Sequence, residues 1–490
     1  MEINETNETN KIYNVLKERF GFTEFRPGQY EVIRDVISRK DTIAILPTGN
    51  GKSLCFQLPG YMSSGIVLII SPLVSLMEDQ VAIMKRNGEK QVVALNSFLT
   101  FKEKNRIVKS LHVYKFIFIS PEMLLQQNVM TELKKITISL LVIDEAHCIS
   151  QWGFDFRPDY LRIGEFLKHI NKPTILALTA TANDKVIKDI KDYLDLNDSV
   201  VHKYSLDRPN ISFSIIKMES QNEKTKWILD RVKQSSGSGV IYVSSRKRAE
   251  SLALFLADKG LSIASYHAGM EQVDRAFVQA QFINGEVKWI CATNAFGMGI
   301  HKGDIRQIIH DQFPSTIAGY IQEIGRAGRD GNLSAATLLF SPEDERKSRF
   351  IVQEDFPTEV EIKQYTNLLT SGVSNEVASE MAGISETKQR VLEYYLERLS
   401  VENTIIRLEE ISLEKEQELQ QMLQIIHSNI CIREQVLSFF DEEVITRPTH
   451  CCSNCGITSL DWLLTAEDQY FQRKPMEWME RLHLLLGEHS

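Results

Sequence analysis

Short, continuous runs of apolar residues recur along the first two thirds of the chain, and each run ends in small or polar residues. Runs that do not alternate with polar residues are typical of parallel strands buried on both faces. Segments with helical periodicity lie between the runs, so the pattern predicts an α/β fold of the doubly wound kind, whose ligands bind at the carboxyl ends of strands. The first group of runs is GIVLIISP from residue 65, KFIFISP from 115, SLLVIDEAH from 139 and TILALTATA from 174.

A second group of apolar runs begins after SLDRPNISF, from residue 205, where the Arg-Pro-Asn sequence predicts an extended linker. Two successive groups of strands predict two α/β lobes in series, which we place at residues 1–207 and 208–343. The second group is GVIYVSS from 239, LSIASYHAG from 261, VKWICATNAFG from 287, IRQIIHDQFP from 305 and SAATLLFSP from 334.

From about residue 343 the apolar runs stop and charged helical periodicity takes over, which predicts a helical third domain over 344–460 and a short tail over 461–490. Within this domain, NEVASEMAGISETKQRVLEYYLERL from 375 predicts a helix, a tight turn at Gly383 and a second helix. The following NTIIRLEE could form one strand of a wing, which would make 375–408 a helix-turn-helix insert. Two ordinary packing helices joined by a loop are the alternative.

Composition and charge narrow the class of protein only a little. The 490 residues are 43% hydrophobic, which is ordinary for roughly three folded domains. The start, MEINETNETN, is neither basic nor apolar, and we find no run of 18 apolar residues, so we expect a cytoplasmic, nucleoid-associated protein without a membrane segment. The net charge of -9 argues only weakly against nucleic acid, because phosphate contacts need only a local basic stripe.

The sequence LPTGNGKSLC, from residue 46, indicates a nucleotide site after a short apolar strand. Glycines let the backbone turn so that its N–H groups surround phosphate oxygens, Lys52 reaches the outer phosphates, and the Ser53 hydroxyl binds magnesium. The first glycine of the usual pattern is replaced by Leu46, so a chance Gly-Lys-Ser turn competes with this interpretation. The predicted nucleotide-binding residues of this loop are Thr48, Gly49, Asn50, Gly51, Lys52 and Ser53.

Two adjacent carboxylates in LLVIDEAH strengthen the nucleotide interpretation. A buried strand would deliver Asp144 to the metal and Glu145 to the attacking water, which is the division of labour that phosphoryl transfer to water requires. An Asp-Glu pair that follows a strand is often only a solvated loop. Its position about ninety residues after a phosphate-binding loop favours a shared ATP site.

The sequence QEIGRAGRDG, from residue 322, offers cations for the charge that develops on a transferring phosphoryl group. Arg326 and Arg329 are the candidates, and a plain basic loop is the alternative. If these arginines reach across from the second lobe, bound ATP closes the cleft between the lobes, and hydrolysis of ATP moves the lobes relative to each other. We add His147 and Gln322 to the predicted catalytic set.

Over residues 12–345 these motifs closely resemble the RecQ DNA helicases of helicase superfamily 2. The resemblance implies that FGFTEFRPGQ grips adenine, with Gln29 on the base edge and with Arg26 and Phe22 against the ring. It also implies two RecA-like lobes with parallel sheets, followed by a helical zinc-binding domain. The other matching motifs are SPLVSLMEDQ from 71, TATA from 179, YHAGM from 266 and ATNAFGMGIHKGD from 292.

The loop SQWGFDFRPDY, which follows the DEAH sequence, matches the aromatic-rich loop with which RecQ proteins sense single-stranded DNA. Aromatic faces stack on bases of any identity, and a nearby arginine steadies the phosphate backbone. Packing of these aromatics on the lobe's own surface is the alternative. The candidate DNA-binding residues are Trp152, Phe154, Phe156 and Arg157.

The resemblance implies an ATP-dependent helicase that moves 3′ to 5′ on single-stranded DNA and serves recombination, repair or replication restart. We expect ATP, magnesium and zinc as cofactors, single-stranded and forked DNA as partners, and a monomer that could also meet single-strand-binding or repair proteins. The rivals are an RNA helicase, a translocase with weak strand separation, and a DNA-binding scaffold without ATPase activity. Because only 35 residues follow Cys455, we expect the winged-helix and small helical domains that usually end RecQ proteins to be absent.

Four of the 7 cysteines gather late in the chain, which indicates a metal site rather than disulfides. In THCCSNCG, Cys452 and Cys455 can give two thiolates to zinc, and Cys431 can give a third. RecQ proteins use four cysteines here, but the commonest spacing would place the last at Thr458. We therefore choose Cys451 as the fourth ligand, with His450 as the alternative and metal-free buried thiols as the remaining one.

Overall fold

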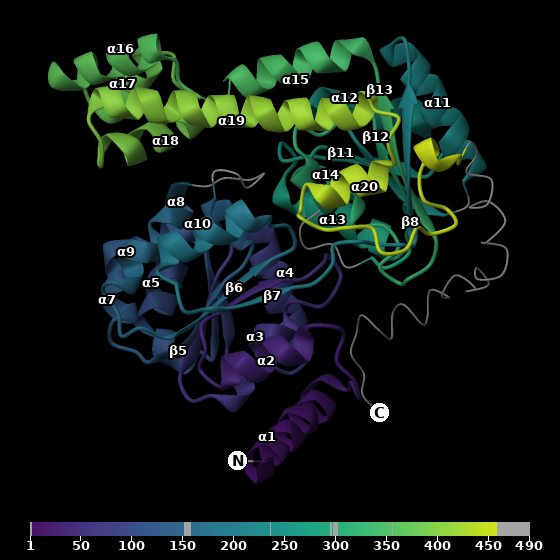
Figure 1. Ribbon diagram of the computed structural model, residues 1–490. Helices are drawn as coiled ribbons and strands as arrows, with labels where there is room; N and C mark the ends of the chain where they lie inside the picture. The colour runs from purple at the N-terminus through teal and green to yellow at the C-terminus, as the bar shows by residue number, and fades with distance from the viewer. Residues whose placement is uncertain are drawn as a thin grey trace.

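Two parallel sheets and a helical domain make up the computed structural model of the chain (Figure 1). The structure describes residues 2–150, 158–235, 237–294, 296, 302–354 and 356–457. Within these ranges, no helix combines the length and the apolar character that crossing a lipid bilayer requires.

Lobe 1 is built on a seven-stranded sheet of order β3-β4-β2-β5-β6-β1-β7, in which every neighbouring pair is parallel. The doubly wound prediction is confirmed for this lobe. The two strands that the apolar pattern did not predict, β3 and β7, are the two edges of the sheet. The strands are β1 (Thr42–Ile45), β2 (Ile66–Ile70), β3 (Val92–Leu95), β4 (Phe116–Ile119), β5 (Ile138–Ile143), β6 (Thr174–Thr179) and β7 (Val200–Lys203).

Helices cover both faces of this sheet. Side chains of α2, α3 and α4 form one apolar cluster with the sheet, and side chains of α5, α7, α9 and α10 form the cluster on the other face. The helices are α1 (Glu2–Val15), α2 (Gln29–Ile37), α3 (Leu54–Met62), α4 (Val74–Arg86), α5 (Phe101–Lys109), α6 (Pro121–Leu124), α7 (Gln127–Leu133), α8 (Pro158–Leu161), α9 (Ile163–Leu167) and α10 (Asp184–Leu194).

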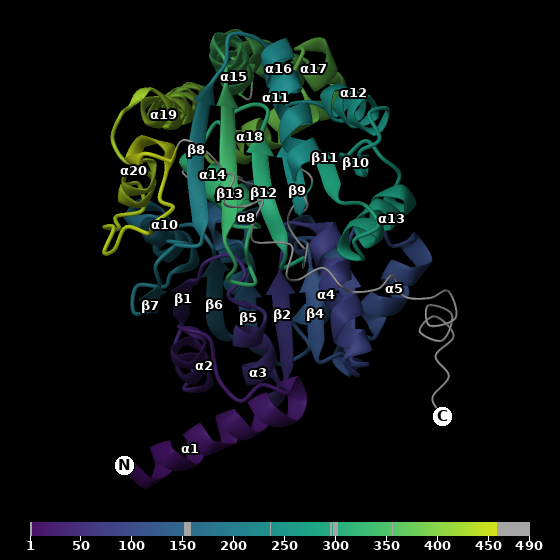
Figure 2. The ribbon, with the colours of Figure 1, turned by 90° about the vertical axis from the view of Figure 1, so that its right-hand side faces the viewer.

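Lobe 2 carries a six-stranded parallel sheet of order β10-β11-β9-β12-β13-β8, which Figure 2 shows above the sheet of lobe 1. The expected linker is shorter than its sequence suggested, because its last residues already belong to the edge strand β8. The elements are β8 (Ile211–Lys217), α11 (Gln221–Gln234), β9 (Ser238–Tyr242), α12 (Arg246–Ala257), β10 (Ile263–Tyr266), α13 (Gln272–Ile283), β11 (Trp289–Ala292), β12 (Ile305–His310), α14 (Ile317–Ile324) and β13 (Ser334–Phe340).

The third domain is helical, and its long helix α19 extends from lobe 2 over lobe 1, where α16, α17 and α18 gather at its end (Figure 1). The predicted helix, turn at Gly383 and second helix are confirmed as α17 and α18, and Gly383 has φ of 72°. Its helices are α15 (Pro342–Glu354), α16 (Glu359–Thr370), α17 (Asn375–Met381), α18 (Glu386–Leu396), α19 (Val401–His427) and α20 (Ile432–Ser438).

The predicted wing strand is wrong, because NTIIRLEE lies inside α19. Its β-branched residues suggested a strand. The buried positions Ile405, Leu408 and Ile411 instead follow the three-residue spacing of one helix face, and packing of that face decides the conformation.

Candidate nucleotide-binding cleft and cysteine cluster

A cavity of about 380 Å³ lies between the two lobes, and both lobes line it. This arrangement gathers residues that are about 300 positions apart in the sequence, from Arg26 to Arg329, at the ends of several elements. The predicted residues on its wall are Arg26, Thr48, Gly49, Gly51, Lys52, Ser53, Asp144, Glu145, Gln322, Arg326 and Arg329.

The phosphate-binding loop connects β1 to α3, and two of its glycines adopt conformations that other residues rarely adopt. Gly49 has φ of 89° and Gly51 has φ of 73°. A Cβ atom on Gly49 would lie 3.1 Å from Cγ of Arg329, and one on Gly51 would lie 2.8 Å from Nε2 of Gln29. The loop is therefore packed against lobe 2 as well as against its own lobe, and both glycines are required for that approach.

The residues that the resemblance assigns to adenine lie beside this loop. The Gln29 amide donates hydrogen bonds to the carbonyls of Asn50, at 2.7 Å, and Gly51, at 3.1 Å. The Arg26 guanidinium donates to the Gly49 carbonyl. Phe22 is 56% exposed and does not line the cavity. In this structure Gln29 and Arg26 brace the phosphate loop, and contact with adenine stays a prediction for all three residues.

Asp144 and Glu145 follow β5 and reach the cleft from the end of that strand. Lys52 Nζ lies 3.8 Å from Oε1 of Glu145. Glu145 is buried and has φ of 49°, a left-handed conformation that is uncommon for a residue with a side chain. Strain of this kind clusters at functional sites, where the surrounding structure holds it in place.

The environment separates the two carboxyls chemically. Burial, followed by repulsion from Glu145, raises the pKa of Asp144 to about 7. Burial also disfavours the charge on Glu145, but Lys52, His147 and Arg326 outweigh it and lower the pKa of Glu145. Arg326 of lobe 2 is therefore close enough to act electrostatically on a carboxylate of lobe 1. Glu145 is held as the anion, as a group that orients or deprotonates water must be.

His147 connects this carboxylate to the TATA sequence at the end of β6. Its Nδ1 atom lies 3.4 Å from Oε2 of Glu145 and 2.8 Å from Oγ1 of Thr179. The side chain is buried. Movement of the segment that follows β6 would therefore be felt at Glu145 through two contacts.

The lobe 2 side of the cleft is formed by the last turn of α14 and the loop that follows it. Gln322 and Arg326 are buried there, and Arg329 is partly buried. Burial, together with the neighbouring guanidinium groups of Arg326 and Arg208, lowers the pKa of Arg329 to about 10. A local excess of positive charge at a pocket wall favours the binding of an anion.

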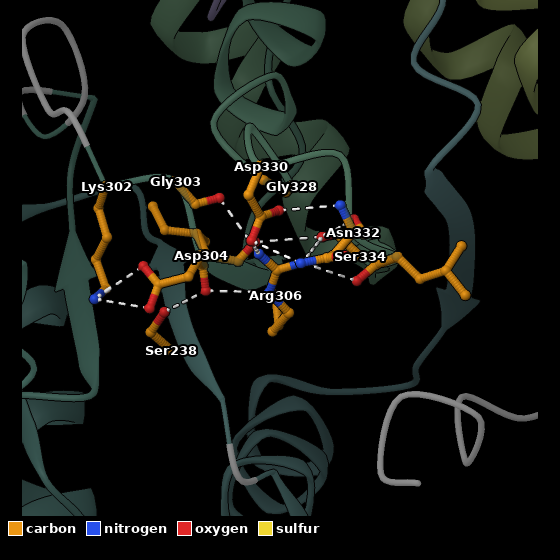
Figure 3. Close-up of polar contacts among 12 residues, drawn as sticks. Ser238, Lys302, Gly303, Asp304, Arg306, Gly328, Asp330, Asn332 and Ser334 are labelled. Carbon is orange, nitrogen blue, oxygen red and sulfur yellow. Dashed lines mark hydrogen bonds and ion pairs between the residues drawn. The ribbon is translucent and has the colours of Figure 1, made fainter. Parts of the chain in front are cut away.

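Arg306 fixes the far end of this loop, and the sequence did not single it out. Figure 3 shows its guanidinium between Asp330, Gly303 and Ser334. It pairs with Asp330 at 2.5 Å and donates to the Gly303 carbonyl at 3.3 Å. Because Asp330 directly follows Arg329, this contact holds the arginine-bearing loop against the start of β12.

The aromatic loop, with Trp152, Phe154, Phe156 and Arg157, lies outside the described residues. Helix α8, which follows it, contacts the residue just after β5: the Tyr160 hydroxyl donates to the Asp144 carbonyl at 3.0 Å. Ser150, which precedes the loop, donates to Asp189 of α10 at 2.5 Å. The segment after the loop is thus tied to the main chain of Asp144, and the segment before it is tied to α10.

The four late cysteines come together in one cluster. The Sγ atom of Cys431 lies 3.6 Å from that of Cys451 and 3.8 Å from that of Cys452, and all four sulfurs, including that of Cys455, lie within 4.8 Å of one another. Tetrahedral zinc with Zn–S bonds of about 2.3 Å would place its sulfurs about 3.8 Å apart. The donor set therefore fits zinc.

Within the described part of the chain, the metal-ligating cluster at this place contains four cysteines and does not include His450. Cys431 is the N-cap residue that directly precedes α20. The cysteine segment pairs with the edge of the lobe 2 sheet, since Phe213 N–H donates to the Cys451 carbonyl at 3.1 Å. The cluster is therefore attached to lobe 2.

The chain matches three protein families along its length. Residues 26–190 match the DEAD/DEAH box helicase family, residues 221–331 the helicase conserved C-terminal domain, and residues 391–456 the RecQ zinc-binding family. These matches cover both lobes and the cysteine cluster.

Curated relatives span different shares of this length. The chain is 40% identical to the probable ATP-dependent DNA helicase RecS of Bacillus subtilis over 97% of its own length and 98% of the relative. It is 41% identical to the ATP-dependent DNA helicase RecQ of Pasteurella multocida, over 68% of its own length and 52% of the relative. The chain thus spans nearly all of the first relative and about half of the second.

Solved helicases share the fold at low sequence identity. The Lhr helicase of Mycobacterium smegmatis, bound to single-stranded DNA and AMP-PNP, matches with a TM-score of 0.58 and 17% identity over 77% of this chain and 56% of that one. Mss116p, bound to single-stranded RNA and AMP-PNP, matches with a TM-score of 0.59 and 19% identity over 84% and 89%. At this identity the likeness shows the two-lobed fold alone.

Proposed function

The chain belongs to the RecQ family of ATP-dependent DNA helicases, and from this membership we propose that it moves 3′ to 5′ along single-stranded DNA and separates duplex strands. The observation that carries the proposal is the cleft, in which the phosphate loop and Glu145 of lobe 1 face Arg326 and Arg329 of lobe 2 across one cavity. Hydrolysis in such a cleft changes the attraction between the lobes, and their motion advances the strand.

Each side of the cleft has its own part in ATP hydrolysis. The phosphate loop and Lys52 bind the phosphates, and Glu145 orients the attacking water and accepts its proton. Arg326 and Arg329 stabilise the charge that develops on the transferring group. Ser53 and Asp144 line the same cavity and would hold magnesium, which neutralises phosphate charge when bound.

Zinc has a structural role in this proposal. The four thiolates leave no open coordination position, which is typical of structural rather than catalytic zinc. The cluster lies on the outer edge of lobe 2, away from the cavity wall. Zinc there holds the third domain folded against the lobe.

The aromatic loop binds single-stranded DNA, and the residues on either side of the loop transmit this binding to the nucleotide site. The contact from Tyr160 to the Asp144 carbonyl, and the position of Ser150 three residues after His147, support a direct connection from this loop to the catalytic carboxylates. Stacking on aromatic side chains does not depend on base identity, which suits a translocating enzyme. We propose a role in recombination, repair or replication restart.

A translocase that separates strands weakly is the second candidate. The candidate element for splitting the duplex is the helix-turn-helix segment over residues 375–408. It carries six Glu against four Lys or Arg, and the side chain of Lys388 is buried. This charge balance disfavours contact with phosphates. A strand-splitting role for this element stays a prediction.

Strand separation on tailed duplexes tests the proposal. Matched DNA duplexes with a 3′ tail, a 5′ tail or no tail are given to the full chain with ATP and magnesium, and both strand release and ATP hydrolysis are measured. Release from the 3′-tailed duplex alone, with hydrolysis stimulated by DNA, is expected. Release that favours the 5′ tail would overturn the polarity, whereas DNA-stimulated hydrolysis without release from any duplex would establish the translocase.

A further inference from the structure

The covalent linker between the lobes carries an arginine that contacts both sides of the nucleotide cleft. Arg208 lies between β7 of lobe 1 and β8 of lobe 2. Its Nη1 atom donates to the Thr48 carbonyl of the phosphate loop at 3.3 Å and to the Gly325 carbonyl of lobe 2, also at 3.3 Å. One guanidinium thus holds main-chain atoms of two lobes at a fixed separation.

The lobe 2 side of this contact is the loop that carries Arg326 and Arg329. Arg208 Nη2 donates to the carbonyls of Ala327, at 3.1 Å, and Gly328, at 2.6 Å. Ala327 and Gly328 lie in the loop beyond α14, where carbonyls are outside any helix or sheet, and a charged donor such as a guanidinium satisfies them well. Arg208 therefore fixes the backbone on both sides of Arg326, and the side chain of that residue is held toward the cleft.

The two loops also touch directly at this point. A Cβ atom on Gly325 would lie 3.2 Å from Cβ of Thr48, so the close approach depends on glycine. Asn210 of the linker adds hydrogen bonds to the carbonyls of Gly328, at 2.8 Å, and Asn332, at 2.9 Å. The linker is therefore part of the wall behind the nucleotide cavity rather than a loose connection.

The third domain holds the linker from behind. Arg433 of α20 is fully buried, pairs with Asp207 and donates to the carbonyls of Arg208, at 3.2 Å, and Ile211. Its guanidinium also lies over the Phe213 ring at 4.7 Å. Both ribbon views place α20 beside β8 (Figures 1 and 2). The backbone of Arg208 is thus anchored while its side chain bridges the lobes.

We propose that Arg208 is a positioning residue for ATP hydrolysis, which couples the phosphate loop to the arginine-bearing loop so that Arg326 and Arg329 occupy the cleft when the lobes close. This inference rests on the proposed roles of those two arginines. Arg208 itself does not line the nucleotide cavity, so it acts through the backbone of both loops. Displacement of catalytic groups by about 1 Å can cost about a hundredfold in rate.

Substitution of Arg208 tests this role in the full chain. For Arg208→Ala we expect kcat for ATP, measured with saturating single-stranded oligothymidylate, to fall about tenfold to a hundredfold. KM for ATP should change less than about threefold, because the phosphate loop and Lys52 remain. Arg208→Lys should lose activity to an intermediate degree, since one ammonium cannot span the acceptors of both lobes.

A matched control separates positioning from general destabilisation. Arg231 of α11 is a buried arginine of lobe 2, and its side chain donates to Gln307 at 2.7 Å. Arg231→Ala should keep kcat near that of the wild type even if its thermal unfolding midpoint falls as far as that of Arg208→Ala. Equal loss of kcat in both variants would overturn the inference, as would a normal kcat in Arg208→Ala or a raised KM with unchanged kcat.

Arg329→Ala, measured alongside, separates the positioning role of Arg208 from the proposed role of the arginine-bearing loop in hydrolysis. If Arg329→Ala abolishes hydrolysis and Arg208→Ala does not reduce it, the positioning role fails and the proposed cleft chemistry stands. If Arg329→Ala hydrolyses ATP normally, the proposed role of the arginine loop fails, and the inference about Arg208 fails with it.

Discussion

Two of the contacts between lobe 1 and the rest of the chain differ in burial and in charge balance. At the nucleotide cleft, buried guanidinium groups of lobe 2 face the phosphate loop and Glu145. Under the third domain, the start of α9 and the residues just after α18 form ion pairs near the surface, Arg162 with Glu397 at 2.7 Å and Arg398 with Glu165. Both glutamates are about half exposed.

The difference shows which contact can respond to ATP. The ion pairs of the third domain neutralise themselves, so they need no ligand and lose strength in salt. The cleft instead gathers guanidinium groups: burial, followed by repulsion from Arg326 and Arg208, lowers the pKa of Arg329 to about 10. A polyanion such as ATP strengthens that contact alone. We therefore expect ATP to drive closure of the cleft, whereas the ion pairs under the third domain can break and reform at a small cost in free energy.

The largest expected effect is that of Lys52→Ala. Removal of the ammonium takes away its contact with the phosphates, and we expect ATP hydrolysis to fall about a thousandfold or more. Single-stranded DNA binding, measured by fluorescence anisotropy without ATP, should change little. Lys135→Ala, at an exposed surface lysine, is the control. If DNA binding in Lys52→Ala fell as far as ATP hydrolysis, the nucleotide site and the DNA-binding surface would not be separate.

Loss of the cysteine cluster should have the next largest effect, because the proposed zinc site holds the third domain folded against lobe 2. Cys431→Ala, Cys451→Ala and Cys455→Ala should each lose bound zinc and lower the free energy of unfolding on the order of several kcal/mol. Zinc per chain and thermal unfolding are the measurements, with His450→Ala and Cys291→Ala as controls. Full zinc in Cys451→Ala with loss in His450→Ala would contradict the ligand set; so would wild-type protein, purified without chelator, that holds none.

Trp152→Ala should leave the slow basal hydrolysis and remove its stimulation by DNA. Stacking on an aromatic side chain contributes about 1–3 kcal/mol per base, so affinity for single-stranded DNA should also fall. Trp152→Phe keeps a stacking face and should retain most of the stimulation. Steady-state ATPase assays with increasing oligonucleotide give both quantities. Undiminished stimulation in the alanine variant would rule out Trp152 as the sensor.

The smallest effect is expected at the ion pairs under the third domain. Arg398→Ala and Arg162→Ala should each lower the free energy of unfolding by no more than about 1 kcal/mol, since exposed pairs contribute little. Chemical denaturation in low and high salt measures this, and the difference from wild type should shrink in high salt. A loss of several kcal/mol that persists in salt would show that this contact is as firm as the cleft.

Much of the fold was readable in the sequence because buried central strands are continuous apolar runs. The missed strands β3, β7 and β8 are sheet edges, and β7, whose residues are all half-buried, lacks such a run. NTIIRLEE was misjudged because its β-branched residues outweighed a helical spacing that only packing makes decisive.

In the site, too, some residues could be predicted from sequence motifs and others could not. The residues that we propose to act in ATP hydrolysis fall in recognisable motifs, and the structure brings Lys52, Glu145 and Arg329 to one cavity. Arg208 and Arg433 were missed because their partners include main-chain carbonyls, which every residue supplies and which leave no pattern in a sequence. Such contacts become visible only when the backbone is in place.

The most direct test of the account is to measure ATP binding and ATP hydrolysis in one preparation of Arg329→Ala. The affinity for AMP-PNP is measured by equilibrium titration, and hydrolysis is measured with saturating single-stranded DNA. If lobe 1 binds the nucleotide and lobe 2 supplies the charge for hydrolysis, affinity should stay within about fivefold of wild type while hydrolysis falls about a thousandfold. Hydrolysis within tenfold of wild type, or affinity that is lost to the same degree as hydrolysis, would contradict the account.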